Sequence, residues 1–265
     1  MMKRLHLFEF EDLPWFPASL RDMMTDLLGL TIEIGRLYHP VLPRLAAALR
    51  ATGDREILDM CSGGGGPVPG LRRRLSSKHG LAVQACLSDF YPNVGAFAAI
   101  AEREGGAVTY VPTPVDATQV PPELPGFRTM FSCLHHFRPE QAEAILRDAW
   151  ERGRGIGIFE VTERSLAGLA QTMMGPLSTL MLTPFVRPYR FSRLVFTYAV
   201  PIVPALFLFD GLVSNLRTYT QDELRAMTRS LQRDDYRWEI GQVKHWLLPT
   251  KVTYLIGVPL RPRGA

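Results

Sequence analysis

The sequence predicts an α/β fold with a Rossmann-like sheet of seven strands, mostly parallel, in which the last strand is antiparallel. Short apolar segments alternate with helical segments from residue 56 to residue 161, a pattern typical of a parallel sheet covered by helices. Four consecutive glycines follow the first of these apolar segments. Near the carboxyl end, two apolar segments are separated by a short turn, which predicts an antiparallel pair.

The first predicted elements are N-terminal helices. Apolar residues at helical spacing predict a helix within residues 19–37 and a second, shorter one over residues 45–49. Gly80 and Gly105 then end two helices of the alternating region. In chain order, the predicted elements of that region are strand 56–59, helix 68–79, strand 81–88, helix 94–104, strand 107–111, strand 128–133, helix 140–152 and strand 155–161.

The alternation stops near residue 164 and resumes at residue 220. Thr220 and Glu223 form a capping box that begins a helix reaching Leu231. Strands over residues 236–246 and 251–258 follow with so short a turn that they must run antiparallel.

Composition restricts the class of protein. The 265 residues are 46% hydrophobic and 21% charged, as expected of one large globular unit. A formal charge of +4 permits an acidic partner without requiring one. Three scattered cysteines, without a CxxC pair, argue against a disulfide framework and fit a reducing compartment. The N-terminus carries acidic residues where a signal peptide has an apolar run, so we expect a cytoplasmic protein.

The region after the fifth strand is unusually apolar. Residues 165–186 and 194–209 contain no charged side chain, and Arg187, Arg190 and Arg193 lie between them. Prolines and polar residues interrupt both stretches, which argues against a membrane-spanning hairpin because a span needs about 20 predominantly apolar residues. Three interpretations remain open: a cap over an apolar substrate pocket, a buried or homodimer face, and a contact with a membrane surface.

Acidic residues end or follow the first three predicted strands. They are Asp59 before the glycines, Asp89 after the second strand and Asp116 after the third. In an open α/β sheet, ligands bind outside the carboxyl ends of the strands. A carboxylate after the second strand suits the hydroxyls of a ribose, and one after the third suits an exocyclic amine. Each aspartate alone is more simply a cap or turn residue, but the three in order favour a cofactor site.

The segment from Leu58 to Gly65 resembles the first motif of class I S-adenosylmethionine-dependent methyltransferases. In that family an acidic residue is followed by glycines at the second, fourth and sixth positions. Gly63 and Gly65 match this pattern, whereas Cys61 replaces the first glycine. The resemblance implies that the cofactor is S-adenosylmethionine and that Asp89 binds its ribose. The cofactor-binding residues that it implies are Asp59, Cys61, Ser62, Gly63, Gly65, Asp89, Phe90, Asp116, Ala117 and Leu134.

The resemblance extends to two later segments. Residues 132–137, Ser-Cys-Leu-His-His-Phe, resemble the segment that borders cofactor and substrate in small-molecule members, and Glu160 ends the fifth strand. On this basis the chain divides into four regions. They are an N-terminal helical lid (1–50), a cofactor-binding core (51–162), an apolar helical cap (163–219) and the C-terminal part of the core sheet (220–265).

The candidate catalytic residues are His135, His136 and Glu160. A sulfonium methyl group is already activated, so a general base is needed only when the acceptor carries a proton. Imidazole titrates near neutrality, but adjacent histidines in extended or turn backbone point apart, so at most one faces the ligand. Both histidines could instead have purely structural roles. No histidines and acids have a metal-ligand spacing, and we expect no metal.

An acidic and aromatic patch at the N-terminus contains Glu9, Glu11, Asp12 and Trp15. It is either part of a lid or ordinary surface packing, and the second explanation is the simpler one.

The resemblance predicts a methyltransferase that acts on a small, apolar or natural-product-like acceptor. Amino-group modifiers of nucleic acids usually carry Asn/Asp-Pro-Pro-aromatic after the fourth strand, where this chain has Ser-Cys-Leu-His. No clustered basic stripe is present either, so we expect no nucleic-acid partner. Two alternatives remain open: a nucleic-acid methyltransferase, and a protein that uses the cofactor, or binds a membrane surface, without methyl transfer.

Overall fold

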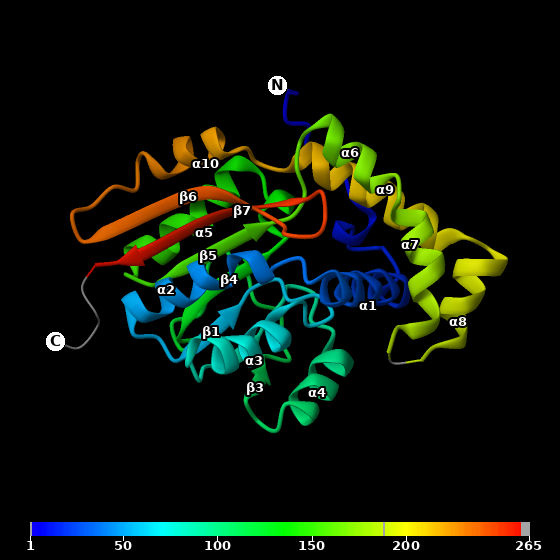
Figure 1. Ribbon diagram of the computed structural model, residues 1–265, viewed down its shortest axis with the longest axis horizontal. Coiled ribbons are helices and arrows are strands. Elements are labelled where there is room, and N and C mark those ends of the chain that lie inside the picture. Colours follow the sequence, from blue (N-terminus) through cyan, green and yellow to red (C-terminus); the bar gives the residue numbers. More distant parts are fainter. Residues whose placement is uncertain (1, 188, 261–265) are drawn as a thin grey trace.

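A seven-stranded sheet forms the centre of the computed structural model, which describes residues 2–187 and 189–260 (Figure 1). The strand order is β3-β2-β1-β4-β5-β7-β6. β7 is antiparallel to both of its neighbours, and the pairs among β1 to β5 are parallel. This confirms the predicted fold class. The strands are β1 (Glu56–Asp59), β2 (Gln84–Leu87), β3 (Val108–Tyr110), β4 (Phe127–Phe131), β5 (Ile156–Glu160), β6 (Tyr236–Lys244) and β7 (Lys251–Pro259).

The middle of the sheet is buried on both faces. Every residue of β4 and β5 is buried, as expected of central strands of a sheet that helices cover on both faces. The buried Arg128 of β4 is paired with Asp148 at 2.6 Å. From β1, the next two strands are added on one side (β2, then β3), and the following strands are added on the other side, starting with β4. The order of the strands therefore reverses beside β1. Such a switch point leaves a crevice at the carboxyl ends of the strands, where ligands bind in open α/β sheets.

Helices cover the two faces of the sheet and form two separate cores. One core contains residues of α2 (Leu42–Thr52), α3 (Val68–His79) and α4 (Val94–Arg103). The other contains residues of α5 (Pro139–Glu151) and α10 (Gln221–Thr228). The capping box predicted at Thr220 and Glu223 is present at the start of α10.

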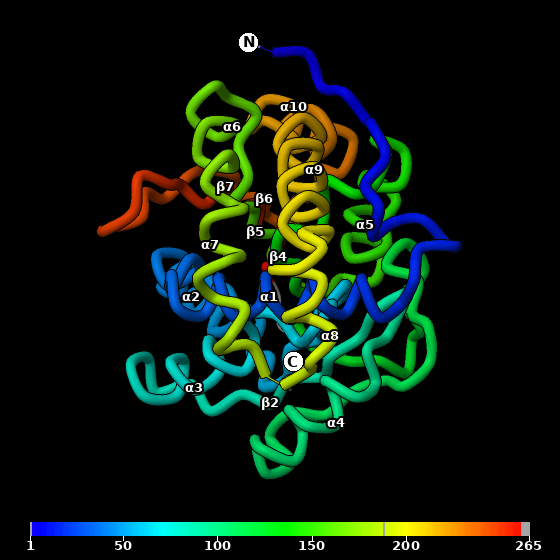
Figure 2. The backbone as a smooth tube through the Cα atoms, turned by 90° about the vertical axis from the view of Figure 1, so that its right-hand side faces the viewer, coloured from blue at the N-terminus to red at the C-terminus, as the bar shows by residue number. Residues whose placement is uncertain are grey.

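The N-terminal helix α1 (Ala18–Gly35) lies at the end of the molecule where the apolar insertion projects (Figures 1 and 2). The insertion packs on it through Val186 and Val203, which contact Met23 and Leu27 of α1. A buried ion pair between Arg193 and Asp26 joins the same two parts. The elements of the insertion are α6 (Leu166–Thr172), α7 (Gly175–Leu182), a 3-10 turn (Thr183–Phe185), α8 (Phe191–Leu194), a π-helical turn (Val195–Ala199) and α9 (Ile202–Arg217).

Within residues 2–187 and 189–260, no single helix is both long and apolar enough to cross a bilayer. One bent pair, Phe191–Ala199 with Ile202–Arg217, meets the length and composition criteria together, with an angle of 78° between its halves.

One strand boundary differs from the prediction in a way that matters for the site. β4 ends at Phe131, two residues earlier than expected, because Ser132 adopts a left-handed backbone with φ of 47°. The chain then forms a 3-10 turn over Leu134–His136. This turn decides how the two adjacent histidines point.

Candidate cofactor and substrate cavity

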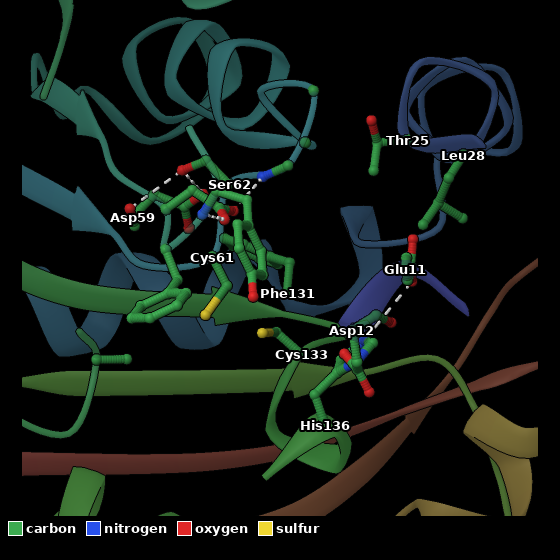
Figure 3. A pocket seen from close by; sticks show the side chains of 18 of the residues that line it. Glu11, Asp12, Thr25, Leu28, Asp59, Cys61, Ser62, Phe131, Cys133 and His136 are labelled. Carbon is green, nitrogen blue, oxygen red and sulfur yellow. Dashed lines mark hydrogen bonds and ion pairs between the residues drawn. The ribbon is translucent and has the colours of Figure 1, made fainter. Parts of the chain in front are cut away.

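A cavity of about 540 Å³ lies at the carboxyl ends of β1 and β4. The glycine-rich loop after β1 forms one wall, and the turn that carries His136 forms the opposite one (Figure 3). Thr25 and Leu28 of α1 line a third side, and Glu11 and Asp12 approach from the N-terminal segment (Figure 3). Four separate segments of the chain therefore meet at one site.

The backbone of the glycine-rich loop is held in conformations that most residues avoid. Cys61, which occupies the position of a family glycine, has φ of 61°, a left-handed conformation that is uncommon for a residue with a side chain. Gly65 has φ of 100°, and a Cβ placed there would overlap Ile100 Cδ1. Gly65 does not line the cavity but lies behind the loop, where its missing side chain allows α4 to pack closely.

Asp59 fixes the start of this loop through hydrogen bonds to its side chain. Its side chain is buried and accepts hydrogen bonds from Ser62 Oγ at 2.8 Å and Thr129 Oγ1 at 2.6 Å. Burial raises the pKa of Asp59 to about 7, although both hydroxyl donors act in the opposite direction. Asp59, Cys61, Ser62 and Gly63 all line the cavity.

Asp89 connects the loop to the end of β2. Its Oδ2 accepts a hydrogen bond from the Gly63 amide at 2.8 Å, and its Oδ1 accepts one from the Tyr91 amide at 2.8 Å. Each carboxylate oxygen can accept more than one hydrogen bond, so two ribose hydroxyls can still be accommodated. Phe90 is about half exposed and lines the cavity next to Asp89.

Asp116 lies at the far end of the same wall. Its Oδ1 accepts hydrogen bonds from the amide and the hydroxyl of Thr118, at 2.8 and 2.7 Å, which is a local, turn-forming role. Both Asp116 and the buried Ala117 line the cavity. The side chain therefore closes a turn while its carboxylate stays at the cavity wall.

The adjacent histidines point in different directions. His136 lines the cavity, whereas His135 is buried, and its Nδ1 donates a hydrogen bond to Glu160 Oε2 at 2.7 Å. Glu160 also accepts from the Leu134 amide at 2.8 Å. Burial alone would raise the pKa of Glu160, but His135 and the Leu134 amide hold it below its usual value. His135, Glu160 and Leu134 lie outside the cavity wall and support the turn that carries His136.

Carboxylates from the N-terminal segment surround His136. Its Nδ1 lies 2.7 Å from Asp12 Oδ1 and 3.5 Å from Glu9 Oε2. Burial would lower the pKa of His136, but Glu9 and Asp12 raise it well above its ordinary value, so the ring is an imidazolium at neutral pH. For the acidic residues of the patch the simpler explanation, surface packing, is wrong, because Glu9 is fully buried and Glu11 and Asp12 line the cavity. Trp15, by contrast, is exposed and does not line the cavity.

Glu11 also faces the cavity, and its carboxyl group is protonated at neutral pH. Its Oε1 lies 3.9 Å from His136 Nε2, and 21% of its side chain is exposed. Burial raises the pKa of Glu11 to about 8, with further contributions from Glu9 and Asp210. Glu11 is therefore largely a neutral carboxylic acid at pH 7, beside a charged imidazolium.

Arg217 belongs to the same group of charged side chains around His136, and no sequence pattern had indicated it. It is buried, forms ion pairs with Glu9 at 3.0 Å and Asp12 at 2.6 Å, and donates a hydrogen bond to the His136 carbonyl at 2.7 Å. In the described part of the insertion, Arg217 is the residue that lines this cavity. Apart from Arg217, no described residue of the 163–219 region lines the cavity, whereas several residues of α1 and the N-terminal segment do.

Glu9, His135 and His136 also bring three possible metal-ligand atoms within 4.8 Å of one another. The guanidinium of Arg217 already lies 3.0 Å from Glu9 and supplies a positive charge there. The prediction that the chain holds no metal stays a prediction.

Comparison with known proteins gives a match in fold rather than in sequence. No protein-family model matches the chain, and no curated protein matches it. The structure of the mitomycin 7-O-methyltransferase MmcR aligns over 94% of this chain with a TM-score of 0.55 and 15% identity, and the chain spans 60% of that protein's length. The structure of the plantazolicin methyltransferase BpumL in complex with SAH aligns over 91% of this chain and 95% of that chain, with a TM-score of 0.49 and 11% identity. The chain has the fold of the class I S-adenosylmethionine-dependent methyltransferases.

Proposed function

We propose that the protein is an S-adenosylmethionine-dependent methyltransferase that modifies a small, apolar or natural-product-like acceptor. One observation carries the proposal. The glycine-rich loop, Asp89 and Asp116 form one wall of a cavity whose opposite wall holds His136 and Glu11. A site for a nucleoside cofactor and a site for proton chemistry therefore face each other across a single space of about 540 Å³.

The donor set of the first wall fits the cofactor. Asp89 would hold the ribose, since its carboxylate is fixed by two backbone amides and retains accepting capacity. Asp116 and Ala117 would contact the adenine, and the backbone of Cys61 and Gly63 would border the methionine end. When bound, the cofactor supplies a methyl group on a sulfonium, which is already activated for displacement.

The chain's own contribution is alignment, exclusion of water and removal of a proton. Glu11 is the residue best placed to accept the acceptor's proton, because it lines the cavity and its raised pKa makes its carboxylate a stronger base than usual. His136 remains charged and, held by Asp12 at 2.7 Å, presents a positive edge to an acceptor oxygen that becomes negative. His135 and Glu160 act as positioning residues for this turn.

The remaining wall supports an apolar acceptor. Leu28 and Ile32 of α1 and Phe131 and Phe137 of the β4 side line the same cavity, so a flat apolar body would contact hydrocarbon on two sides. α1 and the N-terminal segment would act as the lid over the reacting atoms.

The test is a methyl-transfer assay with the purified protein. The protein is incubated with S-adenosylmethionine and a panel of phenols, hydroxy acids, amines and an extracted small-molecule pool, and products are analysed by mass spectrometry. We expect an acceptor to gain one CH₂ unit together with stoichiometric S-adenosylhomocysteine, and Asp89→Ala to abolish both signals. Tight cofactor binding without transfer to any class of acceptor would contradict the proposal.

A further inference from the structure

The outer face of the insertion exposes a group of large apolar side chains. We call it the insertion face and define it by Leu177, Met181, Phe185, Tyr189, Phe191 and Tyr198. Met181 is 65% and Phe191 75% exposed. Leu177 and Met181 lie on α7, and Phe191 begins α8, whereas the other three lie in the turns and the loop between the helices. α7 packs along α9, and this part of the insertion is turned toward the viewer in Figure 2. Scattered surface leucines are normal, but a contiguous apolar face marks a binding surface.

Polarity in these helices is inverted. Thr179, Thr183 and Thr197 are buried, while several long apolar side chains of the same elements are exposed. Leu182 and Phe196 instead pack on the core shared with α1. The buried hydroxyls are satisfied within the insertion, since Thr179 Oγ1 donates to the Gly175 carbonyl at 2.9 Å and the Thr183 and Thr197 hydroxyls lie 3.4 Å apart. Small polar residues between helices, with large apolar residues outside, are typical of helices whose surroundings are apolar.

The charged side chains within residues 165–209, the part of the insertion that carries this face, are all positive. This segment contains no Asp or Glu and three arginines. Arg193 is buried against Asp26, and Arg190 pairs with Asp22 at 3.3 Å. Arg187 remains exposed at the tip, with its guanidinium 5.7 Å from the Tyr189 ring. Apolar, aromatic and cationic side chains together are the composition of segments that bind the interface of bilayers with anionic lipids.

A second cavity extends this cationic character. It has a volume of about 450 Å³, and Arg187 and Phe185 line it together with Arg36 of the α1 C-terminus. Two further arginines and two acidic residues, Asp26 and Glu33, also line it, so the cations outnumber the carboxylates. The tip of the insertion therefore presents an arginine-lined hollow directly beside its apolar side chains. A second copy of the chain docked on this face would bring the same cations and no carboxylate from this segment, which disfavours a self-association surface.

We propose that the insertion face binds the surface of a lipid bilayer that contains anionic lipids. Its apolar side chains would enter the headgroup region, and Arg187 would contact lipid phosphates. The helices would lie in the interface rather than cross the membrane, since α7 has only 8 residues and the break before α9 is bent by 78°. This proposal does not depend on the methyl-transfer reaction.

The test is co-sedimentation of the full chain with phosphatidylcholine vesicles, with and without phosphatidylglycerol. We expect binding that is stronger to the anionic vesicles and weakens with salt. The double variant Met181→Asp/Phe191→Asp should lose about tenfold or more in affinity, because it removes two large side chains from the apolar contact. Arg187→Glu should lose about fivefold or more on anionic vesicles and little on neutral ones.

The matched control is Leu247→Asp in the turn between β6 and β7, where the replaced side chain is 71% exposed but lies outside the insertion. It should bind vesicles like the original protein, and circular dichroism should show all variants folded. Absence of vesicle binding, or equal losses in Leu247→Asp and the double variant, would overturn the proposal. Light scattering that shows a dimer of the original chain and a monomer of the double variant would assign this face to a second copy and also overturn it.

Discussion

Substituting Gly65 tests the geometry of the loop on which the cofactor site depends. Alanine at this position must adopt φ of 100°, which costs about 1–3 kcal/mol for a residue with a side chain. Its Cβ would also overlap Ile100 Cδ1, while the next nearest atoms lie at 3.6 and 3.8 Å, which is ordinary contact. Moving the end of the isoleucine off its rotamer adds about 0.5–1.5 kcal/mol. We therefore expect Gly65→Ala to lower the free energy of unfolding by about 2–4 kcal/mol.

A double-mutant cycle separates the two contributions. Ile100→Val removes the one clashing atom and by itself costs about 0.5–1.5 kcal/mol. In that background, Gly65→Ala should cost only the backbone part, about 1–3 kcal/mol, so the two changes should couple favourably by about 1 kcal/mol. Urea unfolding followed by circular dichroism measures all four proteins.

The control for this cycle is Gly70→Ala in α3, where a Cβ would meet no atom within 4 Å and φ is not positive. This change should leave stability unchanged or raise it by up to about 1 kcal/mol. Gly65→Ala with a loss below about 0.5 kcal/mol in both backgrounds would refute the loop conformation described here.

Three further predictions concern the cavity. Cys61→Gly should raise the free energy of unfolding by up to about 1 kcal/mol in urea titrations, because it relieves a left-handed φ of 61°; a loss would show that the thiol is needed. Asp89→Ala should weaken S-adenosylmethionine binding by about a hundredfold in calorimetry, because it removes a charged acceptor, with Asp116→Asn much milder. Glu11 is protonated below its pKa of about 8, so the transfer rate should increase as pH rises through 8, and Glu11→Gln should flatten that profile; an unchanged profile would exclude Glu11 as the base.

The fold was predictable because the signals for it are local. The apolar segments of the parallel strands, the turn between the last two strands and the capping box at Thr220 each depend on neighbouring residues. The boundaries were less predictable where a single backbone angle decides them. The left-handed Ser132 ends β4 after Phe131, although nothing in the sequence distinguishes this serine from one that continues a strand.

The cofactor wall could be anticipated from the sequence, but the opposite wall could not. Strand ends of a parallel sheet meet at one edge, so Asp59, Asp89 and Asp116 follow from topology. The carboxylates around His136 come from a segment more than 120 residues earlier in the chain, with no periodic pattern to place it. The adjacent histidines were distinguishable only after the 3-10 turn was seen to bury His135 on Glu160.

A crystal structure of the protein with S-adenosylhomocysteine tests the central claim most directly. We predict ribose hydroxyls within hydrogen-bonding distance of Asp89, the adenine beside Asp116 and Ala117, and the sulfur pointing toward His136 and Glu11. A nucleoside bound outside this cavity, or within it without contact to Asp89, would contradict the assignment of the site and the activity proposed from it.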